Sequence, residues 1–154
     1  MLYHNNIHLA KETLNYVYDI GIDNAVLFPY HVKPGTLLAW LWEHDLYQCC
    51  SLWSLSEVLQ SLDEERLKRT SISWYRNYYA DKTKILSSPR VCEKCEEEVL
   101  NLFDEYKNYP SKVALEKLVS YRCPCKQKWK NSLDSQTWKI EFEQIVAIYE
   151  ILAR

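Results

Sequence analysis

The segment VCEKCEEEV, residues 91–99, places a CxxC cysteine pair directly before an acidic run. A second pair follows in YRCPCKQKWK, residues 121–130, where one proline separates the two cysteines. Each tight pair delivers two sulfur atoms already close together, which lowers the entropic cost of gathering four ligands around one ion. We therefore predict that a structural zinc ion, Zn²⁺, is held by Cys92, Cys95, Cys123 and Cys125.

Two other interpretations of these cysteines stay open on the sequence alone. The four could be free buried thiols, or the CxxC pair could be a redox site. A redox site is less favoured because no thioredoxin-like strand–helix–strand pattern surrounds the pair. Zinc is favoured by neighbouring cations that would offset the net negative charge of a zinc ion with four thiolates, namely Arg90, Lys94, Arg122 and Lys126.

Composition predicts a mainly α fold. The 154 residues include only two glycines and five prolines, and an all-β chain needs more turn residues than that. We expect a helical domain over residues 1–88, with a helix-turn-helix-like three-helix core over 36–86, and a zinc-stapled helical region over 89–154, packed as one compact unit. No apolar run approaches the roughly 20 residues that a membrane span needs, so a soluble cytoplasmic protein without membrane contact is expected.

Periodicity and capping signals give the expected elements. Helices are expected over residues 8–20, 36–47, 54–62, 63–86, 96–109, 111–122 and 137–153, and segment 25–32 is the best strand candidate. Two capping boxes, in which a serine accepts from the third helical N–H and a glutamate reaches back, are formed by Ser54 with Glu57 and Ser61 with Glu64. The helix over 36–47 is expected to bury Leu37, Leu38, Leu41 and Trp42.

The helices over 36–47, 54–62 and 63–86 have the proportions of a helix-turn-helix, in which a short second helix braces a third that enters the major groove. On a helical wheel, the third helix places apolar residues on one side and a row of cations nearly opposite. Such cations can meet phosphates, and a tyrosine at their margin can stack on bases. With the lysines after the second cysteine pair, the predicted nucleic-acid-binding residues are Arg66, Lys68, Arg69, Arg76, Tyr79, Lys84, Lys126, Lys128 and Lys130.

Charge is segregated along the chain. Residues 1–65 carry nine acids against two lysines, whereas residues 66–91 carry seven cations against Asp81 alone. The cations would suit nucleic acid, and the acids would suit a basic protein partner, so the block that is contiguous in the fold decides between them. A homodimer is also considered, because the helix over 137–153 has an apolar stripe that would be either core or a dimer seam, formed by Trp138, Phe142, Ile145, Tyr149 and Leu152.

The expected function is not enzymatic, because the chain has no dinucleotide-binding, P-loop or zinc-protease motif. The favoured interpretation is a zinc-containing nucleic-acid-binding protein, either a small transcriptional regulator or a subunit of a nucleoprotein complex, with DNA favoured over RNA. The alternative is an acidic protein-binding adaptor or inhibitor that acts through the N-terminal half, for example a phage-type inhibitor of a nucleic-acid-binding machine.

Overall fold

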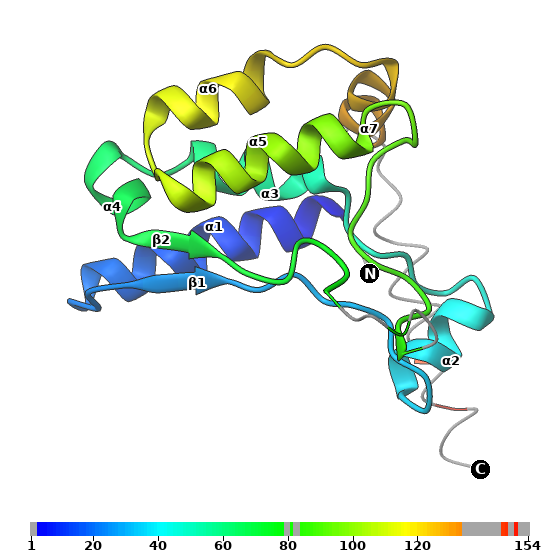
Figure 1. The fold of residues 1–154 in the computed structure, drawn as a ribbon. Helices are drawn as coiled ribbons and strands as arrows, with labels where there is room; N and C mark the ends of the chain where they lie inside the picture. The colour runs from blue at the N-terminus through cyan, green and yellow to red at the C-terminus, as the bar shows by residue number, and fades with distance from the viewer. Residues whose placement is uncertain (1–2, 79–80, 82–83, 134–145, 148–149, 151–154) are drawn as a thin grey trace.

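The computed structural model describes residues 3–78, 81, 84–133, 146, 147 and 150 of the chain (Figure 1). In chain order the elements are α1 (Tyr3–Asp19), β1 (Ala25–Leu27), α2 (Leu37–Glu43), α3 (Leu52–Gln60), α4 (Glu64–Lys68), β2 (Thr70–Ile72), α5 (Glu96–Asn108), α6 (Lys112–Ser120) and α7 (Pro124–Leu133). The prediction of a mainly α fold is confirmed. Nowhere in the described part of the chain is a helix long and apolar enough to cross a membrane.

The two strands form a small parallel sheet, with Ala25 opposite Thr70 and Leu27 opposite Ile72. Parallel neighbours need a crossover connection, and α2, α3 and α4 provide it. Figure 1 shows the sheet in front of α1, with α5 running above it. The strand candidate over 25–32 is thus a strand for its first three residues only.

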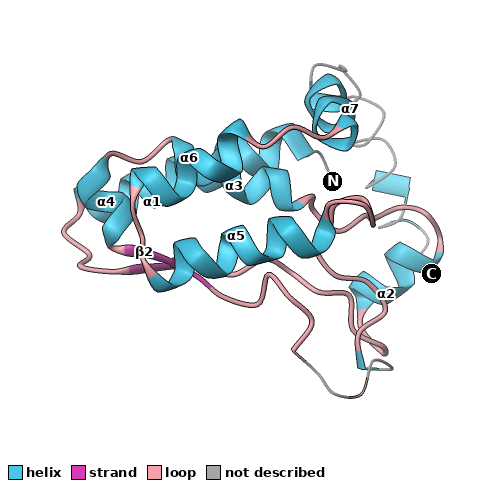
Figure 2. Cartoon of the chain, turned by 45° about the horizontal axis from the view of Figure 1, so that its top comes forward, coloured by secondary structure: helices cyan, strands magenta, loops and turns pink. Residues whose placement is uncertain are grey.

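Helix α3 lies at the centre of the core. It buries Leu52, Trp53, Leu55, Val58 and Leu59, and a helix that is apolar on most sides is typical of an enclosed element. It packs against α1 and α6, and α6 packs against α5 (Figure 2). The same buried cluster takes side chains from both expected parts of the chain, before and after residue 88, such as Leu14, Leu67, Phe103 and Leu118.

The prediction of one long helix over 63–86 is wrong. Among the described residues of this segment, the α-helix is limited to Glu64–Lys68, and the chain then continues as β2. The run from Thr70 to Tyr75 is rich in β-branched and aromatic residues, which favour extended backbone. Thr70 is fully buried, with its Oγ1 2.7 Å from the hydroxyl of Tyr18. The basic residues of this segment therefore do not share a helical face.

The helix-turn-helix expected over 36–86 is not found, because its third helix has only five residues. Helix α2 lies far from α4 in Figures 1 and 2, at the opposite end of the sheet. Helix α2 is also shorter and less buried than expected, since Leu37 is exposed and Leu38, Leu41 and Trp42 are half-buried. Residues 36–69 instead belong to the crossover between the two strands, and Thr70–Ile72 is the second strand itself.

Both predicted capping boxes begin at the wrong residue. The N-caps of α3 and α4 are Ser51 and Asp63, whose side chains accept from backbone N–H groups of the first turn. Ser54 lies inside α3, where it accepts from the indole N–H of Trp129 at 3.1 Å. Ser61 lies at the other end of α3 and donates to a carbonyl one turn back. A local serine–glutamate pattern was outweighed by these tertiary and helix-end hydrogen bonds.

The helices expected on either side of the break at residues 109–111 are confirmed as α5 and α6. Ser111 is the N-cap of α6 and accepts from the backbone N–H of Ala114 at 3.2 Å. The helix expected over 137–153, with its apolar stripe, lies outside the described residues apart from 146, 147 and 150. Its role as core or homodimer seam stays a prediction.

Candidate metal centre

The four predicted cysteines meet in one cluster, in which all sulfur atoms lie within 4.8 Å of one another. Cys92 Sγ is 3.5 Å from both Cys95 Sγ and Cys123 Sγ. Cys125 Sγ is 3.6 Å from Cys95 Sγ and 3.4 Å from Cys123 Sγ. The two cysteine pairs therefore form a single four-sulfur group, although about thirty residues separate them in the sequence.

These distances fit a metal site better than disulfides. A tetrahedral ion with metal–sulfur bonds of about 2.3 Å holds its sulfur atoms about 3.8 Å apart, whereas a disulfide holds them at about 2.0 Å. The cysteines are all free thiols in the structure. A group of four sulfurs could hold one metal ion in a closed shell.

Helix starts position both cysteine pairs. Cys95 is the residue before α5, and its backbone N–H donates to the carbonyl of Cys92 at 3.0 Å in the turn between them. Cys125 lies in the first turn of α7, and the N–H of Lys126 donates to the carbonyl of Cys123 at 3.0 Å. Two helix N-termini therefore converge on the sulfur atoms, and their positive ends favour thiolates.

Trp53 of α3 connects this cluster to the core. Its indole Nε1–H donates to Cys125 Sγ at 3.4 Å, and its ring stacks on Tyr121 with 5.9 Å between centroids. The ammonium group of Lys126 also lies over the Trp53 ring, with Nζ 4.8 Å from the ring centroid. Residues from α3, the α6–α7 connection and α7 thus hold one face of the cluster in place.

Hydrogen bonds also adjust the sulfur chemistry. Burial alone would raise the pKa of the Cys125 thiol. Hydrogen bonds from the Cys92 backbone and from Trp53 have the larger opposite effect and lower this pKa to about 7. Burial, followed by hydrogen bonds with the other cysteines, raises the pKa of Cys95. Cys125 therefore supplies the thiolate form, which is the form that binds metal, more readily than Cys95.

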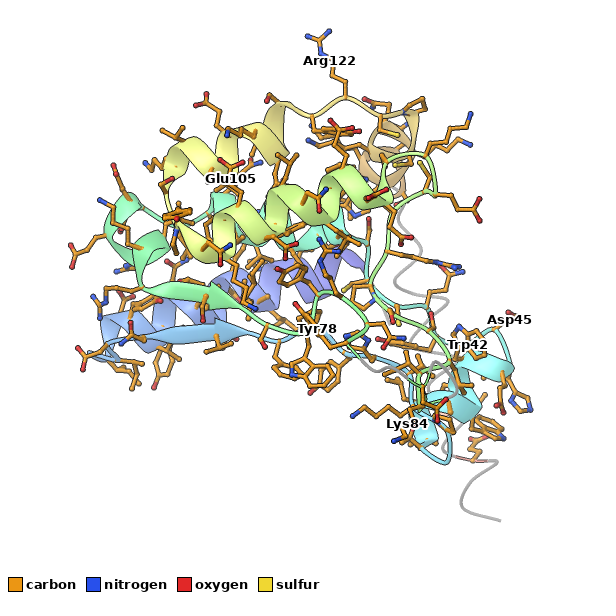
Figure 3. The ribbon with its side chains drawn as sticks, in the orientation of Figure 1. Trp42, Asp45, Tyr78, Lys84, Glu105 and Arg122 are labelled. Atoms are coloured by element: carbon orange, nitrogen blue, oxygen red, sulfur yellow. The ribbon has the colours of Figure 1, made fainter. Side chains whose placement is uncertain are left out.

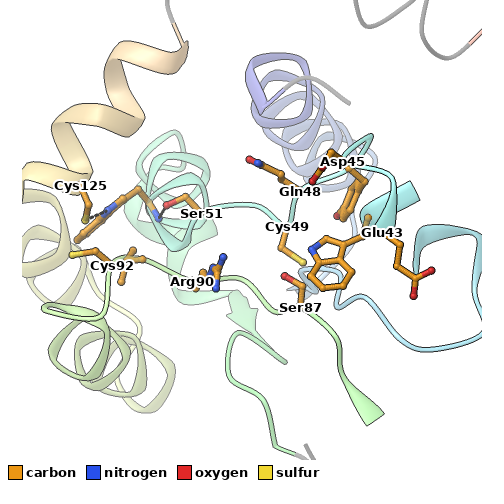
Figure 4. Close-up of a pocket in the computed structure, with 13 residues that line it drawn as sticks. Glu43, Asp45, Gln48, Cys49, Ser51, Ser87, Arg90, Cys92 and Cys125 are labelled. Atoms are coloured by element: carbon orange, nitrogen blue, oxygen red, sulfur yellow. Dashed lines mark hydrogen bonds between the residues drawn. The ribbon is translucent and has the colours of Figure 1, made fainter. Parts of the chain in front are cut away.

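A cleft of about 690 Å³ lies beside the cluster, with Cys92 and Cys125 in its wall (Figure 4). Arg90 lies between the cysteine end of this cleft and the end formed by Cys49 and Ser87. Burial raises the pKa of Cys49, so its thiol stays protonated at neutral pH. The cleft gives solvent access to one side of the four-sulfur group.

The predicted nucleic-acid-binding arginines contact acids of the same chain. Arg66 contacts Asp19 at 2.6 Å, and Arg69 donates to two backbone carbonyls at 2.5 and 2.6 Å near the end of α1. Arg76 forms an ion pair with Asp104 of α5. These guanidinium groups are half-buried and already bound to oxygen atoms of the same chain, so the structure does not present them as one phosphate-binding row.

The predicted lysines are distributed over distant places. Lys68 pairs with Glu64 at 3.1 Å, and Lys126 is buried. Lys128 and Lys130 are exposed on α7, and Lys84 is exposed near α2, at the opposite end of the molecule from Arg122 (Figure 3). Tyr79 lies outside the described residues. The eight predicted binding residues that the structure describes therefore do not form one surface.

Charge neutralisation across the chain also affects the acidic block. Several acids of this block form ion pairs. Asp19 pairs with Arg66, Glu57 pairs with Lys11 at 2.7 Å, and Glu65 pairs with Arg69 at 3.5 Å. Acids of segment 1–65 therefore pair with cations of segment 66–91 and also with Lys11 of their own segment.

The contact of Trp53 with the cysteines and the burial of Lys126 were not predicted from the sequence. Trp53 is thirty-nine residues before Cys92, so no spacing rule connects it to the cysteines. From the sequence, Lys126 was expected to offset the charge of the zinc site and, with Lys128 and Lys130, to bind nucleic acid, and neither expectation required its side chain to be buried.

No protein-family model matches this chain, and comparisons with curated proteins and with solved structures find no match either.

Proposed function

We propose that this chain is a non-enzymatic zinc protein that binds nucleic acid through a cationic hollow beside its metal centre. Zinc is the metal we favour because four thiolates in a closed tetrahedral group are the usual structural zinc ligands. Its role would be to fix the start of α7 against α3 and α5. Binding to nucleic acid would then occur on the outer side of α7.

The cationic hollow carries the proposal. It has a volume of about 640 Å³ and lies where α6 ends and α7 begins. Arg122, Lys126 and Lys130 line it together with Ser120 and Gln127, and its described lining includes no acid. A hollow lined by one sign of charge raises the local concentration of anions, and phosphates are the anions that a chain of nucleotides presents.

The exposed cations at the start of α7 differ in their contacts from Arg66, Arg69 and Arg76, which are bound to oxygen atoms of the same chain. Within the described residues, Arg122, Lys128 and Lys130 form no ion pair. Figure 3 shows Arg122 pointing away from the ribbon into solvent. We name Arg122, Lys128 and Lys130 the α7-side cations; they can reach a phosphate without breaking an existing ion pair.

Helix α7 can present these cations because its other face is fixed. Trp129 is buried and donates to Ser54 of α3 at 3.1 Å, and Cys125 belongs to the sulfur group. Residues three and four positions apart share a helix face, so Cys125 and Trp129 orient the helix. The lysines are left on the solvent side, as their exposure requires.

The metal part of the proposal is tested by measuring the metal content of the purified protein by mass spectrometry. One zinc per chain is expected in the wild type, with loss of zinc and a lower melting temperature in Cys92→Ser. Cys50→Ser, which alters a half-buried cysteine outside the cluster, should retain the metal. A wild type without metal, or Cys92→Ser with full metal content, would contradict the zinc assignment.

Nucleic-acid binding is tested by fluorescence anisotropy with single-stranded DNA, duplex DNA and RNA at several salt concentrations. Replacing all three α7-side cations by Ala should weaken binding and reduce the slope of log K against log salt by about 2–3, because each lost phosphate contact removes nearly one unit. The matched control is the triple variant Lys68→Ala, Lys112→Ala, Lys117→Ala, which makes the same change in net charge at exposed positions elsewhere. Equal losses in both variants would mean that net charge alone, and not this hollow, attracts the ligand.

An acidic surface for a protein partner is the less supported alternative, since many acids of segment 1–65 are already paired with cations of this chain. It becomes the preferred proposal if the metal-loaded protein binds none of the three nucleic acids.

A further inference from the structure

An extended segment beside the sheet exposes apolar side chains on its outer face. Along residues 25–30 exposed and less exposed positions alternate, and the outward ones are Val26, Phe28 and Tyr30, which are 59, 55 and 74% exposed. The outer face of a half-buried strand is usually polar. Contiguous exposed apolar groups of this kind mark interaction sites in soluble proteins.

Rings from a second segment extend this face. Trp74 and Tyr78 follow β2, and the Trp74 ring centroid is 5.9 Å from that of Phe28 and 5.6 Å from that of Tyr78. Figure 3 shows Tyr78 beside a group of rings on the lower side of the ribbon. We name Phe28, Trp74 and Tyr78 the aromatic surface. It joins two segments that are more than forty residues apart in the sequence.

The backbone of Trp74 is held in an unfavourable conformation at this surface. Its φ of 56° is in the left-handed region, which is rarely adopted by a bulky residue. The buried His31 supports it, with Nε2 donating to the Trp74 carbonyl and Nδ1 3.1 Å from Ser88 Oγ. Such conformations persist only where surrounding contacts hold them, and they cluster at binding sites.

Cations lie at the edges of the rings. Lys33 Nζ is 5.8 Å from the Trp74 ring centroid, and Lys107 Nζ is 5.7 Å from that of Tyr78. The nearby acid Asp104 already holds Arg76 and the hydroxyl of Tyr75. The aromatic surface is therefore bordered by positive charge, which suits an anionic ligand with flat apolar groups.

We propose that the aromatic surface stacks the bases of single-stranded nucleic acid, with Lys33 and Lys107 contacting its phosphates. Exposed rings combined with cations are the usual means of binding single strands, whose bases offer free faces that a duplex keeps stacked. The inference rests on the proposed function, because it presumes that nucleic acid is the ligand. It adds that the preferred form is single-stranded.

The test compares a single-stranded DNA of about 12 nucleotides with a duplex of the same sequence by fluorescence anisotropy, in the wild type and in Phe28→Ala, Tyr78→Ala. Both side chains are largely exposed, so the double variant should fold. The wild type should prefer the single strand. The variant should lose at least about fivefold of its single-strand affinity, with the salt slope unchanged, because stacking rather than charge is removed.

The matched control is Tyr16→Ala, Tyr109→Ala, which removes two exposed rings from other parts of the surface and should keep full affinity. A 2-aminopurine base placed in the single strand should be quenched by the wild type and less by Phe28→Ala, Tyr78→Ala. Wild-type binding that the double variant leaves unchanged would overturn the stacking surface while the proposed function stands, and would redirect this face to a protein partner. Absence of any binding by the metal-loaded wild type would overturn the proposed function itself.

Discussion

Trp53 is the residue whose role is best defined by its contacts at the cysteine cluster. Replacing it by Phe keeps a large ring in the core but removes the N–H that donates to Cys125 Sγ. Partners that hydrogen-bond to a metal ligand typically contribute 10- to 100-fold to metal affinity, so Trp53→Phe should weaken zinc binding by about that factor. Competition with a chromophoric zinc chelator measures the change.

Trp129→Phe is the matched control for this prediction. It also removes one indole hydrogen bond from the core, but the acceptor is Ser54 Oγ rather than a cysteine. It should lower stability without changing zinc affinity. If both variants weaken zinc binding equally, Trp53 acts through general packing and not through its hydrogen bond to sulfur.

Tyr106 links α5 to the segment around β2. Its hydroxyl lies 3.0 Å from the carbonyl of Leu67 and 2.9 Å from that of Thr70, and the side chain is fully buried. Tyr106→Phe leaves these carbonyls without that donor and should cost about 1–3 kcal/mol in the free energy of unfolding at neutral pH. Urea denaturation of the variant, with the exposed Tyr109→Phe as control, measures this cost.

Alkaline pH provides a second measurement on Tyr106. Burial, followed by the nearby Tyr18, raises the pKa of Tyr106 well above its usual value of 10. The unfolded chain releases this proton first, so the contribution to stability is complete below pH 10 and is lost as the pH rises through and above that value. The free energy of unfolding should therefore fall less steeply above pH 10 in Tyr106→Phe than in the wild type. Parallel curves would show that Tyr106 does not cause the alkaline loss.

At the residue scale, the sequence predicted the four cysteines that could bind a metal, but not the residues that hold them in place. The cysteines could be found because CxxC and CxC spacings place sulfur atoms together by local geometry alone. Trp53 and the neutralised arginines could not be found, because their partners depend on which helices pack together. A charged residue such as Arg66 has the same local pattern whether it meets a phosphate or Asp19.

The junction of α6 and α7 depends on one buried lysine. The last carbonyls of a helix lack partners within the helix, and Lys126 Nζ donates to those of Leu118 and Val119 at 2.9 and 2.5 Å. Lys126→Met keeps the aliphatic length but removes the donor and the charge. We expect a loss of about 1–3 kcal/mol in the free energy of unfolding, measured by urea denaturation of the metal-loaded protein.

Lys112→Met, at an exposed position in the first turn of α6, is the control for the loss of one positive charge. It should leave the free energy of unfolding nearly unchanged. If Lys126→Met were equally harmless, water would be replacing the ammonium group at the end of α6, and the lysine would not hold the junction together.

At the element scale, the sequence was a good guide to α5 and α6 and a poor one between residues 63 and 86. Helices α5 and α6 have a break with a clear N-cap, Ser111, and local signals suffice for both. In segment 63–86 the helical wheel looked amphipathic, but β2 pairs with a strand forty-five residues earlier. The buried pair of Thr70 and Tyr18 is a tertiary contact that no local window contains.

At the scale of the whole molecule, some of the charged residues that the structure describes form ion pairs within the fold and others stay exposed without a partner acid. Opposite charges of segments 1–65 and 66–91 hold α1 against α4, as Arg66 and Asp19 illustrate. Among the described cations, Arg122, Lys128 and Lys130 form no ion pair and lie at the start of α7 or on it. Counting charges along the sequence gave the two blocks but not their pairing, because ion pairs such as Arg66 with Asp19 form only when α1 and α4 pack together.

Metal removal should separate the parts of the molecule that depend on zinc from those that do not. Helix α3 buries its apolar side chains against α1 and α6, so this core should survive treatment with a strong chelator. The four cysteines join segment 91–98 to the start of helix α7, and hydrogen exchange should become faster there when the metal is removed. Cys123→Ser should reproduce the same pattern without chelator.

Nucleic-acid affinity should follow the state of α7, because the α7-side cations depend on the placement of that helix. Affinity should fall together with the hydrogen-exchange protection of α7 and return when zinc is restored. Uniform loss of protection across α1, α3 and α7 would instead show that the metal supports the entire fold, and unchanged protection would show that packing of Trp129 alone keeps α7 in place.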